Sequence, residues 1–191
     1  ACDVADRLGL IRPIVEQPQY NIYERSKVEF EYSDLIKKYK LGLTVWSPLA
    51  RGVLSGKYSA KVSNVDESAA RALVGEFEGK VEKTRQLEPI AKKLGCTLAQ
   101  LAIAWCVSNE NVSTVLLGAR NPSQLEETLK ALAFVDKLTP DVKSEIDAIV
   151  QFVPQLSASD VFDTVRERYL VGEQKEVPSW THIINPTNSS Q

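Results

Sequence analysis

A short loop over residues 47–57 combines residue types that could hold a flat ring and a phosphate group. Two cations, Arg51 and Lys57, and two glycines lie within the segment SPLARGVLSGK, and Trp46 comes directly before it. Exposed backbone amides, positive charge and an indole surface together suit a nucleotide-like ligand. By spacing alone the same pattern is more often a structural turn. The surrounding elements must therefore decide between the two interpretations.

Three short apolar runs have the length and composition of buried strands. They are PIVEQ at 13–17, LTVW at 43–46 and STVLL at 113–117. The middle run stops at Ser47-Pro48, where proline cannot donate a hydrogen bond within a sheet. The last run ends at Gly118. We therefore expect three strands, each closed by a breaking residue.

Helical patterns fill the intervals between these runs. Apolar spacing and stop signals predict helices over 1–9, 24–40 and 80–94. Capping signals predict three more helices, which begin after the capping box at Thr97–Gln100, after Asn121-Pro122 and after Thr139-Pro140. Residues 59–79 follow no clean period, and we interpret them as a mobile excursion that carries Arg71.

Alternating strands and helices predict an α/β fold with parallel strands, either a barrel or a doubly wound sheet. In both architectures ligands bind at the carboxyl ends of the strands. Gln17, Trp46-Ser47 and Gly118 hold that position on three successive strands. We therefore expect them to border one binding site, which favours a ligand-binding role for the loop.

Composition excludes several classes of function. The chain has 191 residues, 43% of them hydrophobic, and a net charge of −2, which gives no electrostatic argument for a nucleic-acid partner. No apolar run approaches the roughly 18 residues of a spanning helix, so we predict no direct membrane insertion. Cys2, Cys96 and Cys106 lack metal-ligand spacing. We predict no metal site and, from the reduced thiols, a cytoplasmic protein.

Pattern and composition also suggest how the chain is divided. The strand–helix pattern decays beyond Pro154, and we predict a domain over 1–153 followed by a surface or disordered extension over 154–191. The chain begins with Ala1, contains no methionine and opens within a helical pattern. We interpret it as a fragment of a longer protein.

Four segments, taken in order, resemble the second half of the aldo-keto reductases, and in particular the branch that contains the voltage-gated potassium channel β subunits. They are PIVEQPQYNIYERSKVE, GLTVWSPLARGVLSGKY, LGCTLAQLAIAWC and VSTVLLGARNPSQLEE. The resemblance covers residues 1 to about 150. It implies a (β/α)8 TIM barrel that binds NADP(H), of which this chain supplies the second half with three strand–helix units.

The resemblance also assigns cofactor contacts. It implies that Gln17 lies near the nicotinamide carboxamide and that Trp46 stacks on the nicotinamide ring. The expected pyrophosphate contacts are Ser47, Pro48, Leu49, Ala50, Arg51, Lys57 and Arg71. The expected adenosine-phosphate contacts are Gly118, Arg120, Gln124 and Glu127. Thr128 departs from the family, where asparagine is usual, and Arg51 stands where a smaller residue is often seen.

No catalytic residue is transferred. The Asp, Tyr, Lys and His of the family lie on the first four strands, outside this chain, so the chain alone is expected to be inactive. Three functions remain open. They are an NADP-dependent oxidoreductase acting on aldehydes and ketones, a channel-associated regulatory subunit that keeps the fold, and an inactive partial barrel. The expected partners are a carbonyl substrate and either further copies of the chain or a channel subunit.

Overall fold

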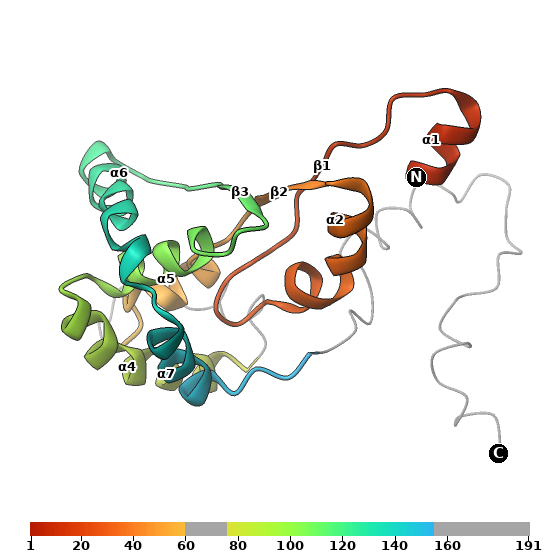
Figure 1. Cartoon of the computed structure of the whole chain (residues 1–191). Coiled ribbons are helices and arrows are strands. Elements are labelled where there is room, and N and C mark those ends of the chain that lie inside the picture. The colour runs from red at the N-terminus through yellow and green to blue at the C-terminus, as the bar shows by residue number, and fades with distance from the viewer. Residues whose placement is uncertain (60–75, 155–191) are drawn as a thin grey trace, which may run out of the picture. The chain divides into compact units, whose positions relative to one another are not determined.

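The structure is a computed structural model that describes residues 1–59 and 76–154. Within these residues the strands form one parallel sheet in the order β1-β2-β3 (Figure 1). The strands are β1 (Val15–Glu16), β2 (Gly42–Val45) and β3 (Val112–Val115). Neighbours in the sheet are also neighbours in the sequence. This sequential order is that of neighbouring strands in a barrel wall, and it also occurs within one half of a doubly wound sheet.

The central strand β2 sets the register of the sheet. Val15 pairs with Gly42, and Val45 pairs with Val115, with one irregularity between Leu43 and Thr44. Leu43 and Val45 are fully buried. Because side chains alternate along a strand, Thr44 faces the opposite side of the sheet. An isolated parallel bridge between Gln19 and Trp46 carries the alignment beyond the end of β2.

The outer strands are not buried as the apolar runs predicted. Both residues of β1 are exposed, with Val15 at 44% and the preceding Ile14 at 77%. Strand β3 is only partly covered, since Ser113 and Thr114 are exposed. The reason is that β1 and β3 are edge strands in the described part of the chain, so each is covered from one side only.

Helices precede, separate and follow the strands in the described part of the chain. They are α1 (Cys2–Leu8), η1 (Lys27–Glu31, a π-helix), α2 (Ser33–Tyr39), η2 (Ala50–Ser55, 3₁₀), α4 (Phe77–Leu94), α5 (Leu98–Val107), α6 (Pro122–Leu129), η3 (Lys130–Lys137, 3₁₀) and α7 (Pro140–Val150). The predicted capping signals at Thr97, Asn121 and Thr139 are confirmed, because each side chain accepts a backbone N–H in the first turn of its helix.

Two expected boundaries differ. The single helix expected over 24–40 is interrupted, because η1 ends at Glu31, Tyr32 lies between the two helices, and α2 begins at Ser33. The break leaves Val28 buried and turns Leu35 outward to 41% exposure, whereas one continuous helix would place both on the same face. Helix α4 starts at Phe77, so the last residues of the predicted excursion over 59–79 are helical. Residues 60–75, including Arg71, lie outside the described residues.

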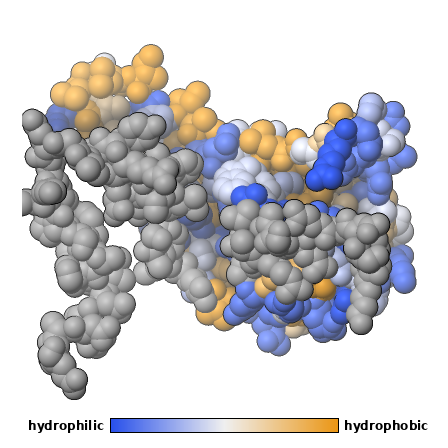
Figure 2. Space-filling model, turned by 180° about the vertical axis from the view of Figure 1, so that it is seen from behind, coloured by the Kyte–Doolittle hydropathy of each residue, from blue (hydrophilic) through white to orange (hydrophobic). Residues whose placement is uncertain are grey.

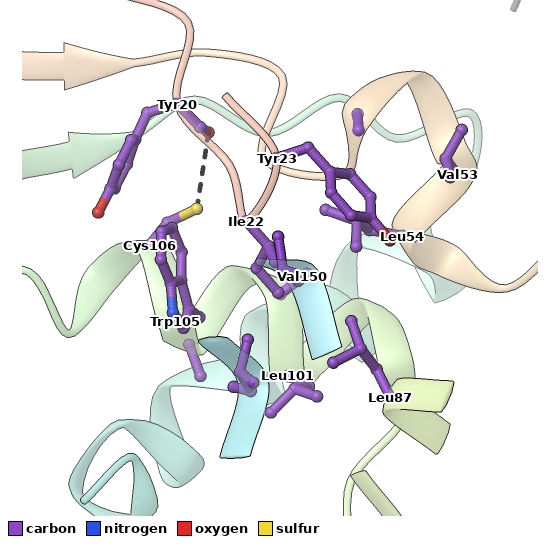
Figure 3. Packing of buried hydrophobic residues seen from close by; sticks show 14 of the residues in the cluster. Tyr20, Ile22, Tyr23, Val53, Leu54, Leu87, Leu101, Trp105, Cys106 and Val150 are labelled. Carbon is purple, nitrogen blue, oxygen red and sulfur yellow. Dashed lines mark hydrogen bonds between the residues drawn. The ribbon is translucent and has the colours of Figure 1, made fainter. Parts of the chain in front are cut away.

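Helix α5 is the centre of the core. It contacts β3, η2, η3, α4 and α6, and its residues from Gln100 to Cys106 are all buried. Figure 3 shows Leu87, Leu101 and Val150, from α4, α5 and α7, gathered near Ile22. The Cys106 thiol donates to the Tyr20 carbonyl oxygen at 3.6 Å. This contact joins the segment after β1 to the core. The burial of α5 agrees with its apolar sequence.

Apolar side chains gather on the N-terminal part of the surface. Leu10, Ile11 and Ile14 are 61%, 95% and 77% exposed, and hydrophobic atoms dominate this region in the upper left of Figure 2. They precede β1, whose outer edge pairs with no described strand. An open edge beside exposed apolar residues is consistent with part of a barrel wall.

No single helix in the described ranges is long and apolar enough to cross a membrane. Helices α4 and α5 reach that length and composition only together, across a bend of 83°.

Candidate functional site

One hollow among the described residues is lined by paired charges. It has a volume of about 390 Å³ and lies beside the C-terminal end of α5. Arg25 donates to Glu29 at 2.9 Å and to Asp147 at 2.6 Å, and its guanidinium carbon lies 5.1 Å from the centre of the Trp105 ring. Tyr20 donates to Glu29 at 2.8 Å. These groups satisfy one another's hydrogen-bonding capacity, so we interpret the cluster as a structural network that holds these segments together.

Burial and pairing also set the protonation of that cluster. Burial alone would lower the pKa of Arg25, but its hydrogen bonds to Glu29 and Asp147 raise it above its usual range. Burial raises the pKa of the Tyr20 phenol, and the nearby Glu29 carboxylate raises it further. Both side chains therefore keep one protonation state at neutral pH, and neither is poised for proton transfer.

The second hollow lies past the carboxyl ends of β2 and β3, where the fold predicts a ligand site. It has a volume of about 270 Å³. One wall comes from the loop after β2, and the other from the segment after β3 together with α6. Its lining consists of Ser47, Pro48, Leu49, Arg51, Gly52, Ser55, Lys57, Leu116, Leu117, Gly118, Gln124 and Thr128. We call this the loop–α6 pocket.

The loop wall of the pocket is held in a strained but fixed conformation. Ser47, Ala50 and Arg51 have φ values of 58°, 46° and 54°, which non-glycine residues rarely adopt. Each such residue costs about 1–2 kcal/mol. Backbone hydrogen bonds hold the turn, with Ala50 N–H donating to Ser47 O at 3.0 Å and Gly52 N–H donating to Leu49 O at 2.8 Å. The wall is therefore formed before any ligand arrives.

The two cations of the loop remain available to an anion. Arg51 and Lys57 are exposed, and neither has an ion-pair partner within the described ranges. The Lys57 ammonium lies 4.6 Å from the centre of the Tyr58 ring, which is a weak contact for a solvated lysine. Two unpaired cations on one wall favour a doubly charged or multiply charged ligand.

The opposite wall offers hydrogen-bond donors. Asn121 caps α6, its side-chain oxygen accepting the Gln124 N–H at 2.9 Å. The Gln124 side-chain oxygen accepts the Arg120 N–H at 2.9 Å. This bond uses the side-chain oxygen of Gln124 and leaves the two Nε2 hydrogens as donors. The backbone N–H groups of Leu117 and Gly118 have no partner among residues 1–59 and 76–154.

Seven of the predicted cofactor contacts come together in this pocket: Ser47, Pro48, Leu49, Arg51, Lys57, Gly118 and Gln124. Five others that the structure describes do not line it: Gln17, Trp46, Ala50, Arg120 and Glu127. Arg71 lies outside the described residues. Contact of any of them with a cofactor stays a prediction.

The residues outside the lining have distinct surroundings. Gln17 is exposed one residue after β1, and Trp46 is half-buried directly after β2. Because Trp46 alternates with the buried Val45, its indole belongs to the open face of the sheet. Ala50 is buried within the turn. Arg120 and Glu127 are exposed before and within α6, and the Glu127 carbonyl oxygen accepts the Gln100 side chain at 3.0 Å.

Sequence reasoning missed five lining residues: Gly52, Ser55, Leu116, Leu117 and Thr128. Gly52 and Ser55 lie within the loop that was singled out, so continuity along the loop was an available signal. Leu116 and Leu117 were read as strand, but β3 stops at Val115 and leaves them at the pocket. Thr128 is buried, and its hydroxyl donates to the Leu125 carbonyl oxygen at 2.9 Å.

The family model for the aldo/keto reductase family matches residues 2–151. The chain belongs to the aldo/keto reductase family. The resemblance to this family that was inferred from the four segments is thus confirmed.

Three relatives show the branch of the aldo/keto reductases to which the chain is similar. A probable voltage-gated potassium channel subunit beta of Oryza sativa subsp. japonica is 48% identical over 168 residues, covering 83% of this chain and 50% of the relative. One of Arabidopsis thaliana is 46% identical, covering 81% and 49%. A putative voltage-gated potassium channel subunit beta of Schizosaccharomyces pombe is 40% identical, covering 79% and 46%. The chain spans about half the length of the curated relatives it matches.

Membership of this family implies a (β/α)8 barrel. The small parallel sheet, with helices between successive strands, is consistent with part of such a barrel. Chemically, the loop–α6 pocket can hold and orient an anion, because it combines a fixed turn with cations and amides that have no partner among residues 1–59 and 76–154. The residues that line it include no His, Asp, Glu or Tyr to act as general acid.

Proposed function

We propose that this aldo/keto reductase chain is the cofactor-binding half of an NADP(H)-dependent oxidoreductase that reduces aldehydes and ketones. The observation that carries the proposal is the loop–α6 pocket, in which Arg51 and Lys57 stand unpaired by any described residue, opposite the free amides before α6. When bound, the nicotinamide cofactor supplies the hydride that reduces the carbonyl carbon.

In this proposal the pyrophosphate group lies between the two walls of the pocket. Arg51 and Lys57 neutralise its charge from the loop, and the Leu117 and Gly118 amides donate from the other side. The Gln124 Nε2 group adds a further donor. The strained turn at residues 47–52 keeps the loop backbone in place, so this wall loses little ordering entropy on binding.

The remaining predicted contacts extend the cofactor away from the pocket. Arg120 directly precedes Asn121, the N-cap of α6, and its guanidinium suits the 2′-phosphate of NADP. Glu127, one turn further along the same helix, is proposed to face the adenine. At the other end Trp46 and Gln17, at the open face and edge of the sheet, are proposed to hold the nicotinamide ring.

Carbonyl reduction also needs a proton donor beside the substrate. We propose that this donor comes from residues outside the 191-residue chain, because no catalytic residue of the family matches within it. The chain expressed alone should then bind cofactor weakly and show no turnover. Turnover by the isolated chain, at the rate of the full-length protein, would contradict this division of labour.

A second function, that of a channel-associated subunit, is favoured by the names of the relatives. Proteins described as potassium channel β subunits are 40–48% identical to this chain. A regulatory subunit with the same fold would bind NADPH in the same pocket, so cofactor binding alone does not separate the two functions. Co-purification of the full-length protein with a potassium channel would support the second one.

The test of the proposed enzyme is carbonyl-dependent oxidation of NADPH by the full-length protein. Absorbance of the reduced nicotinamide should fall when an aldehyde such as 4-nitrobenzaldehyde is added, and the rate should saturate with both substrates. Tight NADPH binding without any aldehyde-dependent oxidation would favour the regulatory function. A protein that bound no NADPH would contradict both.

A further inference from the structure

We propose that Gly52 is a positioning residue for Lys57. The absence of a side chain at position 52 makes room for the Lys57 ammonium at the wall of the loop–α6 pocket. This inference rests on the proposed function, because it concerns the same anion-binding pocket. It concerns a residue that the cofactor-contact assignments leave out.

The geometry between the two residues is tight. Gly52 has φ +92°, and a Cβ atom built there would lie 2.4 Å from Cε and 2.7 Å from Nζ of Lys57. Carbon atoms in contact stay about 3.5–4 Å apart, so any side chain at position 52 would have to push the lysine away. The lysine therefore lies against the bare backbone of Gly52.

Among the described residues, little else fixes the Lys57 ammonium. Its side chain is exposed, and within the described ranges it pairs with no carboxylate. The remaining contact is with Tyr58, whose ring centre lies 4.6 Å from Nζ. Because Tyr58 is buried, its ring is fixed, and the lysine occupies the space between that ring and Gly52. The position of the charge thus depends on the space that the glycine leaves.

Displacing Lys57 should affect binding more than folding. The clashing atoms are the far end of a flexible side chain, which can move into solvent without disturbing the core. The attraction between the ammonium and a phosphate weakens with distance and with solvation. A side chain at position 52 should therefore weaken anion binding by removing the lysine from the pocket wall.

The chain offers a matched control for backbone strain. Gly56 has φ +78°, comparable to that of Gly52, but a Cβ there would meet Leu98 at 2.9 Å, and Gly56 does not line the pocket. Gly52→Ala and Gly56→Ala should both lower the midpoint of thermal unfolding, since both place alanine at positive φ. Only Gly52→Ala should weaken the binding of anions. Gly52→Asn adds the same Cβ with less backbone strain, and it replaces Gly52→Ala in the test if the alanine variant does not fold.

The test measures dissociation constants for NADPH and for inorganic pyrophosphate by calorimetry in the full-length protein. We expect Gly52→Ala and Lys57→Met each to raise both dissociation constants by about fivefold, and Gly56→Ala to raise them by less than about twofold. The double variant Gly52→Ala/Lys57→Met should bind no more weakly than Lys57→Met alone. Unchanged affinity in Gly52→Ala and Gly52→Asn would overturn the inference. So would additive losses in the double variant. A wild-type protein that bound neither ligand would instead refute the proposed function.

Discussion

The side-chain oxygen of Gln124 accepts the backbone N–H of Arg120 at 2.9 Å, which ties the residue before the α6 cap to the first turn of the helix. The bond fixes Gln124 in the pocket wall with its Nε2 group as a donor. One glutamine thus stabilises the helix start and presents a hydrogen-bond donor to the pocket. The two roles can be separated by substitution.

Gln124→Glu should separate them. Glutamate keeps an oxygen for the Arg120 N–H and places a negative charge near the helix N-terminus, where it is favourable. It also loses the donor and repels a phosphate. We expect the melting temperature to change little and the NADPH dissociation constant to rise about tenfold or more. Calorimetry and thermal unfolding measure both. Unchanged affinity would remove Gln124 from the binding site.

Cofactor choice should depend on Arg120. NADP differs from NAD by a phosphate that carries nearly two negative charges, and the Arg120 guanidinium suits that group. We predict that the full-length protein prefers NADPH to NADH, and that Arg120→Glu largely abolishes this preference. The ratio of the two dissociation constants is the measurement. Equal affinities in the unmutated protein would reject the assignment.

Trp46 should report the nicotinamide directly. Stacking of the indole on the ring contributes on the order of 1 kcal/mol beyond area burial. Trp46→Ala should raise the NADPH dissociation constant several-fold and abolish the tryptophan quenching that accompanies cofactor binding. Trp105 is buried on α5 and is the matched control, since its fluorescence should not respond to cofactor. Quenching that survives in Trp46→Ala would identify another stacking partner.

The phenol of Tyr23 should make stability fall at alkaline pH. Its hydroxyl donates to the Lys80 carbonyl oxygen at 2.8 Å and lies 2.8 Å from the Thr84 hydroxyl. Burial raises the pKa of Tyr23 to about 12, although the Thr84 contact lowers it slightly. Above pH 10 the unfolded chain ionises this tyrosine while the folded protein keeps it neutral. The free energy of unfolding should therefore decline between about pH 10 and 12.

Tyr23→Phe tests that decline. The variant should lose about 1–2 kcal/mol of stability at pH 7, because it breaks a buried hydrogen bond. The loss should shrink as pH rises, since phenylalanine does not ionise. Urea unfolding of both proteins across this range gives the difference. A difference that stayed constant up to pH 12 would show that Tyr23 does not contribute to the alkaline loss.

Local signals predicted most helix starts, whereas burial of the strands depended on neighbours that no local pattern reports. The capping residues Thr97, Asn121 and Thr139 act within one turn, so their side chains alone locate the helices that follow. By contrast Ile14 and Val15 were expected in a buried strand because they are apolar. Their exposure follows from the absence of a described strand beside β1, which their own residue types could not reveal.

The candidate site was predictable in its parts but not in its full outline. The resemblance brought Arg51, Lys57 and Gln124 into one site, and the structure places all three in one pocket. Leu117 and Thr128 were missed, because their place in the lining follows from the early end of β3 and from the packing of α6. Neither feature has a local sequence signal that is specific enough to locate a pocket.

Binding of NADPH by the two loop cations Arg51 and Lys57 is tested most directly by a calorimetric titration of the full-length Arg51→Gln/Lys57→Met variant. Lys93→Met is the matched control, because Lys93 is paired with Glu145 at 2.8 Å and does not line the pocket. We predict that the double variant loses affinity for NADPH by about 20-fold or more, while Lys93→Met binds as the unmutated protein does. Equal affinity in all three proteins would contradict the proposed site.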